Sequence, residues 1–191
     1  MYVEKNNRKI SNDFKREVKN CDNCSLCQNQ KPLLDKTTEC DVMWVGLSAK
    51  RVLNINNSIP LDNDTNSGKI IELIENELPS IKFYKTNLVK CLPLDKNGKL
   101  RYPNSSEMNA CINNLLIEIN ILHPQIILIL GKEAYNFIDK YFTRNNLDKT
   151  KLIYIEHPSY IYVYKRKYID DYITKVTNIC EKRVKIKTKK L

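Results

Sequence analysis

The sequence predicts a single α/β domain over residues 1–191, a three-layer α/β/α arrangement around a central, mainly parallel sheet of about four strands. Near-continuous apolar runs at 42–45 and 126–130 are typical of strands buried on both faces of a parallel sheet. Other segments place apolar residues at the three- and four-residue spacing of an amphipathic helix. Because the two patterns alternate along the chain, we expect consecutive strands to run parallel with a helix between them.

Capping and helix-breaking residues set the limits of these elements. Pro79 and Pro124 end the helices before them, because proline cannot continue a helix. Asn104, with Glu107 three residues later, matches a capping box that begins a helix. Gly131 turns a strand into the next helix. In chain order we expect a helix at 10–18, a strand at 41–46, a polar loop at 47–67, a helix at 67–78, a strand at 83–86, a helix at 104–123, a strand at 125–130, a helix at 132–142, a strand at 151–155 and a helix at 164–180.

Gly46, Asn87 and His157 each follow the carboxyl end of an expected strand. The carboxyl ends of parallel strands share one edge, which is where open α/β sheets bind ligands. The amide of Asn87 offers both a donor and an acceptor, so it has the groups needed to read the edge of a base. We therefore expect these three positions to meet in one cleft.

The seven cysteines form an odd set in a chain whose start lacks a secretion signal, which argues against a disulfide framework. Cys21 and Cys24 form a two-ligand clip, and Cys27 follows three residues later. Cys91 and Cys111 are further candidate ligands, spaced too widely for a compact zinc knuckle. An iron–sulfur cluster, a zinc site and simple buried thiols all remain open from the spacing alone.

The net charge of +10 makes nucleic acid the first partner to consider. Lysine is frequent along the whole chain, however, so scattered lysines are also explained as a solvated surface. The cluster Lys165, Arg166 and Lys167 is the candidate DNA contact, because it follows the expected site loop. Residues 183–191 form a basic tail, which we interpret as a loosely ordered end with a secondary role in DNA contact.

No membrane or secretory segment is expected. No apolar run approaches the ~18–20 residues of a membrane span, and the first residues lack the apolar centre of a signal peptide. We expect a soluble, cytoplasmic monomer that binds DNA, with uracil-containing and single-stranded DNA as the candidate forms and with a protein partner left open.

Several motifs together resemble the uracil-DNA glycosylase superfamily, and most closely its iron–sulfur family 4. The resemblance covers roughly residues 20–160. It rests on Cys21-x-x-Cys24-x-Leu26, Thr86-Asn87-Leu88-Val89-Lys90-Cys91-Leu92-Pro93, Pro103-x-x-x-Glu107-x-x-x-Cys111, Leu122-x-Pro124-Gln125-Ile126-Ile127-Leu128-x-Leu130-Gly131 and His157-Pro158.

The resemblance implies the fold of that superfamily and two kinds of site. It implies that Cys21, Cys24, Cys91 and Cys111 hold a 4Fe-4S cluster and that Cys27 is a spare or alternative ligand. It also implies that Asn87 pairs with the edge of a flipped-out uracil. His157 would donate to uracil O2 as negative charge builds there during bond cleavage.

The chain departs from the family after the first strand. The family has a Gly-Glu-x-Pro-Gly stretch there, whereas this chain has Gly46 followed by Leu47, with Lys50 in place of a glycine. The family then has Pro-Phe-x-Gly, whose ring stacks on the base, whereas residues 59–64 here contain no aromatic. Gly46, Leu47 and Asn63 are therefore candidate substrate-binding positions at which the pocket is altered.

These motifs predict a uracil-DNA glycosylase-like, 4Fe-4S, DNA-binding protein of DNA repair type whose uracil excision is weak or lost, a pseudoenzyme. The groups that read the base and stabilise the leaving uracil are kept, and those that activate water and stack on the base are missing. One alternative is an active glycosylase of base excision repair with a changed base preference, and Asp62 or Asp64 is the candidate replacement acid. Another is a non-enzymatic protein-interaction module.

Overall fold

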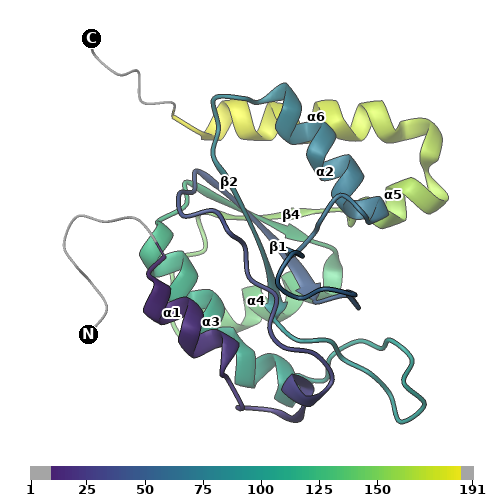
Figure 1. Ribbon diagram of the computed structural model, residues 1–191. Coiled ribbons are helices and arrows are strands. Elements are labelled where there is room, and N and C mark those ends of the chain that lie inside the picture. Colours follow the sequence, from purple (N-terminus) through teal and green to yellow (C-terminus); the bar gives the residue numbers. More distant parts are fainter. Residues whose placement is uncertain (1–9, 186–191) are drawn as a thin grey trace.

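A central parallel sheet organises the computed structural model, which describes residues 10–185 (Figure 1). The sheet has four strands in the order β2-β1-β3-β4, and every neighbouring pair is parallel. The elements are α1 (Asn12–Lys19), η1 (Ser25–Gln28), β1 (Val42–Ser48), α2 (Asn66–Glu77), β2 (Phe83–Val89), α3 (Ser105–Leu122), β3 (Ile126–Leu130), α4 (Lys132–Arg144), β4 (Leu152–Ile155), α5 (Pro158–Tyr164), η2 (Arg166–Tyr168) and α6 (Ile169–Arg183). The expected fold class is confirmed.

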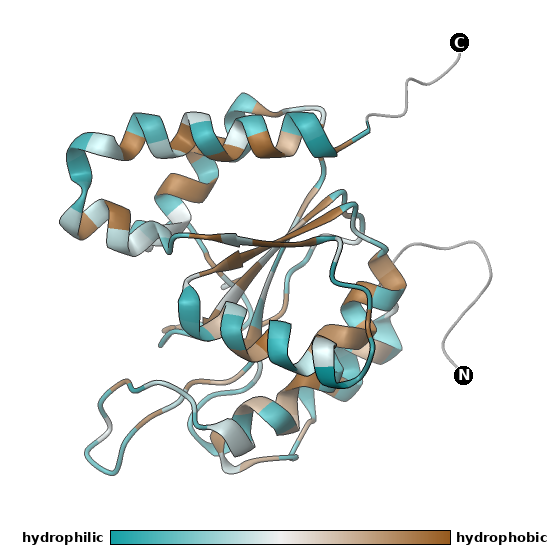
Figure 2. Ribbon diagram, turned by 180° about the vertical axis from the view of Figure 1, so that it is seen from behind, coloured by the Kyte–Doolittle hydropathy of each residue, from teal (hydrophilic) through white to brown (hydrophobic). Residues whose placement is uncertain are grey.

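Helices cover both faces of the sheet. Figure 1 shows α2, α5 and α6 on one side, and α1, α3 and α4 on the other. Alternate residues of β1 point to the two sides: Val42 and Trp44 pack in the α2/α5/α6 core, and Met43 and Val45 in the opposite core. Figure 2 shows the strands as the most hydrophobic layer, between helices with one polar face. This double burial is the reason for the continuous apolar runs.

The capping box expected at the start of α3 is present. The Asn104 side chain accepts from the backbone N–H of Glu107 at 2.9 Å, and the Glu107 carboxylate accepts from the backbone N–H of Asn104 at 2.8 Å. Two of the unpaired groups at the helix start are thereby satisfied. The helix that begins at this cap carries Cys111 in its second turn, beside the end of β2.

Two expected boundaries were wrong. Strand β2 continues through Asn87 to Val89, so Asn87 lies within the strand rather than directly after it. The single helix expected at 164–180 is instead α5, η2 and α6. Pro158 begins α5 one residue after His157, and Lys165 leaves helical geometry with φ −129° and ψ 35°. The spacing of apolar residues does not reveal this break, because α5 and α6 both bury apolar residues in the same core.

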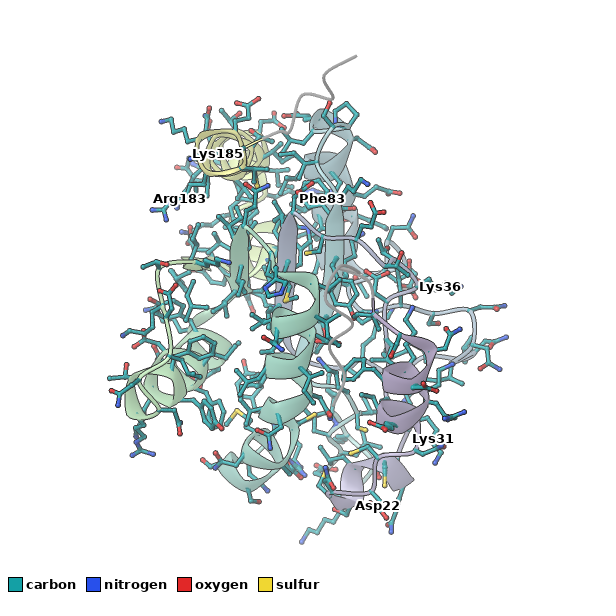
Figure 3. The ribbon with its side chains drawn as sticks, turned by 90° about the vertical axis from the view of Figure 1, so that its left-hand side faces the viewer. Asp22, Lys31, Lys36, Phe83, Arg183 and Lys185 are labelled. Atoms are coloured by element: carbon teal, nitrogen blue, oxygen red, sulfur yellow. The ribbon has the colours of Figure 1, made fainter. Side chains whose placement is uncertain are left out.

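The C-terminal end of α6 lies at the amino ends of the strands. Figure 3 shows Arg183 and Lys185 at the same end of the molecule as Phe83, which begins β2. The backbone N–H of Lys185 donates to Gln125 Oε1 at 2.8 Å, just before β3 begins. The basic tail therefore starts at the edge of the sheet opposite to the carboxyl ends of the strands. Residues 186–191 of that tail lie outside the described residues.

Among residues 10–185, no helix combines the length and the apolar character that a membrane crossing requires.

Candidate functional site

The carboxyl edge of the sheet brings together most of the polar residues predicted for the site. Asn87 on β2 is in register with Gly46 on β1. Gly131 follows β3, and His157 follows β4. The outer strands β2 and β4 are three strand spacings apart, about 14 Å. Asn87 and His157 thus lie on the two outer strands, with Gly46 and Gly131 on the strands between them.

Gly46 is required by its neighbour across the ladder. A Cβ atom built on Gly46 would overlap with Oδ1 of Asn87. Asn87 is 2% exposed, and no hydrogen bond joins its amide to any other residue in the described part of the chain. Neither amide atom is among the fully buried side-chain atoms that lack a partner, so the amide has access to solvent. Its donor and acceptor are therefore open to a group from outside the protein.

We expect Gly46→Ala to lower the free energy of unfolding by about 1–3 kcal/mol, because the added methyl overpacks against the Asn87 amide. The double variant Gly46→Ala/Asn87→Ala should lose less than the sum of the single losses, because the overlapping amide is then absent. Urea unfolding of the four proteins measures this coupling. Strictly additive losses would mean that the methyl group added at position 46 does not meet the Asn87 amide.

His157 caps the first turn of α5. Its Nδ1 accepts from the backbone N–H of Ser159 at 3.3 Å and lies 2.8 Å from the Ser159 hydroxyl. An accepting Nδ1 assigns the proton of the neutral ring to Nε2. Burial lowers the pKa of His157, which favours this neutral form. The ring also lies close to Gly131, where a Cβ would come within 3.6 Å of Cδ2. His157 thus presents a neutral Nε2–H donor.

Leu61 is a site residue that the sequence analysis missed. It has a positive φ of 55°, and its Cδ2 lies 3.3 Å from the Cβ position of Gly46. The next residue is held by close packing of its backbone on Gly68 in the first turn of α2. Leu61 therefore places an apolar group beside Gly46, the residue that also meets the Asn87 amide. A positive φ is rare for leucine, and no pattern in the sequence signals it.

The structure gives Asn63 and Leu47 neighbours other than Gly46 and Asn87. The Asn63 amide donates to Glu72 Oε1 at 3.0 Å, and Asn63 is exposed. The side chain of Leu47 packs against the core on the α1/α3/α4 side of the sheet. Gly46 and Asn87 are one residue out of phase with Leu47, on the other face. Their substrate-binding roles remain predictions.

The two candidate replacement acids differ in their surroundings. The carboxylate of Asp64 forms an ion pair with Lys50 across the loop. Asp62 Oδ1 accepts from the backbone N–H of Asn63 at 2.9 Å, and Asp62 follows Leu61 directly. Asp62 is the acid whose chain neighbour touches Gly46.

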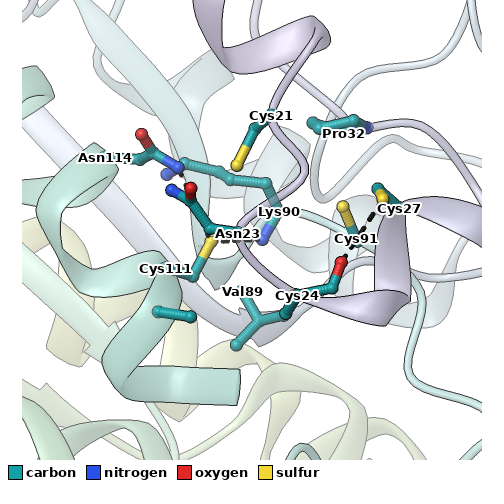
Figure 4. A pocket seen from close by; sticks show the side chains of 11 residues that line it. Cys21, Asn23, Cys24, Cys27, Pro32, Val89, Lys90, Cys91, Cys111 and Asn114 are labelled. Atoms are coloured by element: carbon teal, nitrogen blue, oxygen red, sulfur yellow. Dashed lines mark hydrogen bonds between the residues drawn. The ribbon is translucent and has the colours of Figure 1, made fainter. Parts of the chain in front are cut away.

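Five cysteines line one pocket beside the end of β2 (Figure 4). They come from the segment around η1, from the loop after β2 and from α3. The sulfur of Cys27 donates to the carbonyl of Cys24 at 3.3 Å. The pocket thiols are those of Cys21, Cys24, Cys27, Cys91 and Cys111. The structure therefore gathers the predicted ligands and adds Cys27, whereas Cys180 lies in the opposite core.

The thiols influence one another electrostatically. Burial raises the pKa of Cys91, and the neighbouring thiols Cys111, Cys24, Cys21 and Cys27 raise it further. Burial also raises the pKa of Cys111, whereas the charge and backbone N–H of Lys90 lower it. Thiolates so close together repel one another, so a bound cation is needed for all to ionise. The donor set thus fits a thiolate-bound iron cluster.

The geometry is not that of a site for one metal ion. Between residues 10 and 185, no three Cys, His, Asp or Glu side chains are grouped closely enough to hold a single ion. In a cluster each thiolate binds a different iron, so the sulfurs need not converge on one point.

A fully buried ion pair lies between the cysteine pocket and Asn87. Lys90 and Glu118 are both 0% exposed. Lys90 Nζ donates to Glu118 Oε2 at 2.7 Å, to Thr86 Oγ1 at 2.6 Å and to the Asn87 carbonyl at 2.8 Å. The Tyr84 hydroxyl donates to the second carboxylate oxygen of Glu118 at 3.0 Å. This network anchors β2 to α3 and fixes the backbone at Asn87.

The basic cluster after α5 is engaged with neighbouring rings. Lys165 forms an ion pair with Glu156 at 2.9 Å. Arg166 lies over the ring of Tyr162 at 5.2 Å, and Lys167 over the ring of Tyr168 at 4.9 Å. Arg166 and Lys167 are exposed. Their role in DNA contact stays a prediction.

Comparison with known proteins agrees with this arrangement. The sequence model of the Uracil DNA glycosylase superfamily matches residues 30–180. The chain belongs to this superfamily. That match includes both strands that hold Gly46 and Asn87, the loop with Cys91, α3 and His157, but not the Cys21–Cys24 clip.

Two curated proteins and one solved structure are similar to this chain. The chain is 25% identical to the Type-4 uracil-DNA glycosylase of Sulfurisphaera tokodaii over 169 residues, which cover 82% of this chain and 69% of that protein. It is 26% identical to the Type-4 uracil-DNA glycosylase of Saccharolobus solfataricus over 129 residues, 65% of this chain and 56% of that protein. The crystal structure of wild-type Pedobacter heparinus SMUG2 superposes with a TM-score of 0.58 at 17% identity, covering 75% of this chain and 76% of that one. The structural likeness supports the fold.

Proposed function

We propose that this protein is a uracil-DNA glycosylase-like, 4Fe-4S, DNA-binding protein of the cytoplasm, and that its uracil excision is weak or lost. The observation that supports the base-reading part best is the Asn87 amide, which lies against Gly46, has access to solvent and has no hydrogen-bond partner among the described residues. An amide in that state matches the Watson–Crick edge of one unpaired pyrimidine.

Asn87 and His157 would act on opposite sides of the base. Asn87 binds and orients the base through its amide. His157 keeps its proton on Nε2 through the contacts of Nδ1 with Ser159. That Nε2–H would stabilise the charge that develops on a base oxygen as the glycosidic bond breaks. A neutral donor suits this role, because it carries no charge before the reaction.

Cys21, Cys24, Cys91 and Cys111 would hold the cluster, with Cys27 adjacent in the same pocket. When bound, the cluster supplies metal–thiolate bonds that tie the first cysteine segment to the end of β2 and to α3. The chain itself then positions Asn87 through Lys90, whose ammonium group holds the Asn87 carbonyl.

Weak excision follows from what surrounds Gly46. Position 47 carries a leucine that packs in the opposite core, so no carboxylate from that position orients a water. Leu61 offers an alkyl group where a ring would stack on the base. A general base contributes typically ~10²–10⁴-fold, and base–aromatic stacking contributes about 1–3 kcal/mol.

Uracil release by the cluster-loaded protein should therefore be at least about 10²-fold slower than by a family member with the intact motif. Asn87→Ala and His157→Asn should reduce any residual release to background, since they remove the base-reading and charge-stabilising groups. Single-turnover release of free uracil from single- and double-stranded DNA measures both effects.

Matched controls exist for both substitutions. His123 is the other histidine of the chain, and it is exposed at the end of α3, as is Asn120 nearby. His123→Asn and Asn120→Ala should leave release unchanged. Rapid excision by the unmodified protein would contradict the proposal. Asp62→Asn would then test whether Asp62 is the replacement acid.

DNA binding should weaken steeply with salt, because binding releases condensed counterions from the phosphates. Replacing Lys165, Arg166 and Lys167 by alanine should reduce the slope of log K against log salt by about 0.7–0.9 for each phosphate that the variant no longer neutralises. Ending the chain after Lys185 likewise removes three positive charges, those of the lysines at 187, 189 and 190. It should change the slope less, because the tail begins at the far edge of the sheet. A salt-independent affinity would argue against DNA as the partner.

A further inference from the structure

Exposed tyrosines gather on and around α5. Tyr160 is 46% exposed, Tyr164 is 74% exposed, and Tyr168 in η2 is 47% exposed. Tyr154 on the edge strand β4 is 38% exposed. The glycosylase-like site described above uses none of them. We call Tyr154, Tyr160, Tyr164 and Tyr168 the tyrosine platform.

The rings of the platform are held in place by their neighbours. Tyr160 and Tyr164 are four residues apart on α5, and their ring centroids lie 5.3 Å apart at a tilt of 41°. The ring of Tyr154 meets that of Tyr135 on α4 edge-on at 5.6 Å. Exposed rings that are already ordered lose little entropy when a planar group stacks on them.

Two lysines lie over rings of the platform, and one of them, Lys165, is also paired with Glu156. Lys165 Nζ is 5.3 Å from the ring centre of Tyr160, and Lys167 Nζ is 4.9 Å from that of Tyr168. Grooves that hold single strands combine positive charge along the backbone with aromatic rings on which bases stack. The centre of a protein–protein interface, by contrast, is depleted in charged residues, and lysine especially. The mixture of rings and lysines therefore favours a nucleic acid over a protein.

The platform begins close to His157 along the chain. The backbone N–H of Tyr160 donates to the His157 carbonyl at 2.9 Å, so the first ring lies one helical turn from His157. A strand on the platform would lead one of its bases toward the edge that holds His157 and Asn87.

We propose that the tyrosine platform stacks unpaired bases and gives this protein a preference for single-stranded DNA. The inference rests on the proposed function in DNA binding and adds the strand state. Only unpaired bases have free faces for stacking, because the faces of paired bases are occupied by their neighbours in the duplex. Lys165, Arg166 and Lys167 would neutralise the adjoining phosphates.

The test uses the full, cluster-loaded chain and three fluorescein-labelled probes of equal length: oligothymidylate, an oligomer of abasic sites with the same charge, and a duplex. Oligothymidylate should bind more tightly than either of the others. Tyr160→Ala and Tyr164→Ala should each weaken oligothymidylate binding by about five-fold or more and leave the abasic oligomer unaffected. Tyr160→Phe and Tyr164→Phe should retain binding, because the ring is what stacks.

Tyr102 is a matched control, 75% exposed on the loop before α3. Tyr102→Ala should leave oligothymidylate binding intact, and a loss as large as that of Tyr164→Ala would overturn the platform as the stacking site. Equal affinity for oligothymidylate and the abasic oligomer would overturn stacking while DNA binding stands, and would leave the platform to a protein partner. Absence of salt-sensitive binding to all three probes would refute the proposed function itself.

Discussion

Replacing Cys91 by serine should abolish the iron and the brown colour of the purified protein and destabilise its fold. Cys91 is buried in the pocket between the first cysteine segment and α3. A cluster held there joins segments that are distant in sequence, so its binding energy becomes folding energy. The unmodified protein should contain about four iron and four sulfide per chain. Cys111→Ser should behave in the same way.

Metal content, acid-labile sulfide, the visible absorption spectrum and urea unfolding check this result without any assay of activity. Cys180→Ser is the matched control, since Cys180 is 0% exposed but lies on α6 in the opposite core. That variant should keep its iron and its colour. Cys27→Ser should also keep the colour if Cys27 is the spare thiol of the pocket. Stoichiometric zinc without iron in the unmodified protein would refute the cluster.

Glu118→Ala should lower the free energy of unfolding by about 3–5 kcal/mol, because it leaves Lys90 as an unpaired buried charge. The side chains of Lys90 and Glu118 are 1% and 0% exposed, and their charged atoms are 2.7 Å apart. The substitution also removes the acceptor of the Tyr84 and Thr86 hydroxyls. The loss should be among the largest for any single change in this chain, since most substitutions cost about 0.5–3 kcal/mol.

Urea unfolding monitored by circular dichroism measures this loss. Glu118→Gln should lose less, because an amide oxygen at the Oε2 position still accepts from Lys90 and Thr86, and the amide nitrogen at the Oε1 position can donate to the Tyr84 hydroxyl. Glu181→Ala, at an exposed position of α6, should change stability by no more than about 0.5 kcal/mol. A Glu118→Ala protein as stable as the Glu181→Ala protein would show that Lys90 finds another partner or reaches solvent.

Local patterns in the sequence were sufficient for the fold class. The apolar runs that became β1 and β3 are buried on both faces, and that burial is what a continuous run records. The capping box at Asn104 placed the start of α3 correctly, because it depends only on residues three positions apart. The carboxyl end of β2 and the break between α5 and α6 could not be read in this way. They depend on pairing with β1 and on two helices that share one core.

The sequence by itself determined the layers, the parallel sheet and the gathering of Asn87 and His157 at its carboxyl edge. These follow from side-chain periodicity and from the direction of the strands. Only the tertiary structure decided which neighbours each side chain has. It placed Leu61 rather than Asn63 against Gly46, and it paired Asp64 with Lys50. Such contacts join segments through backbone turns and long-range packing, and no spacing along the chain encodes them.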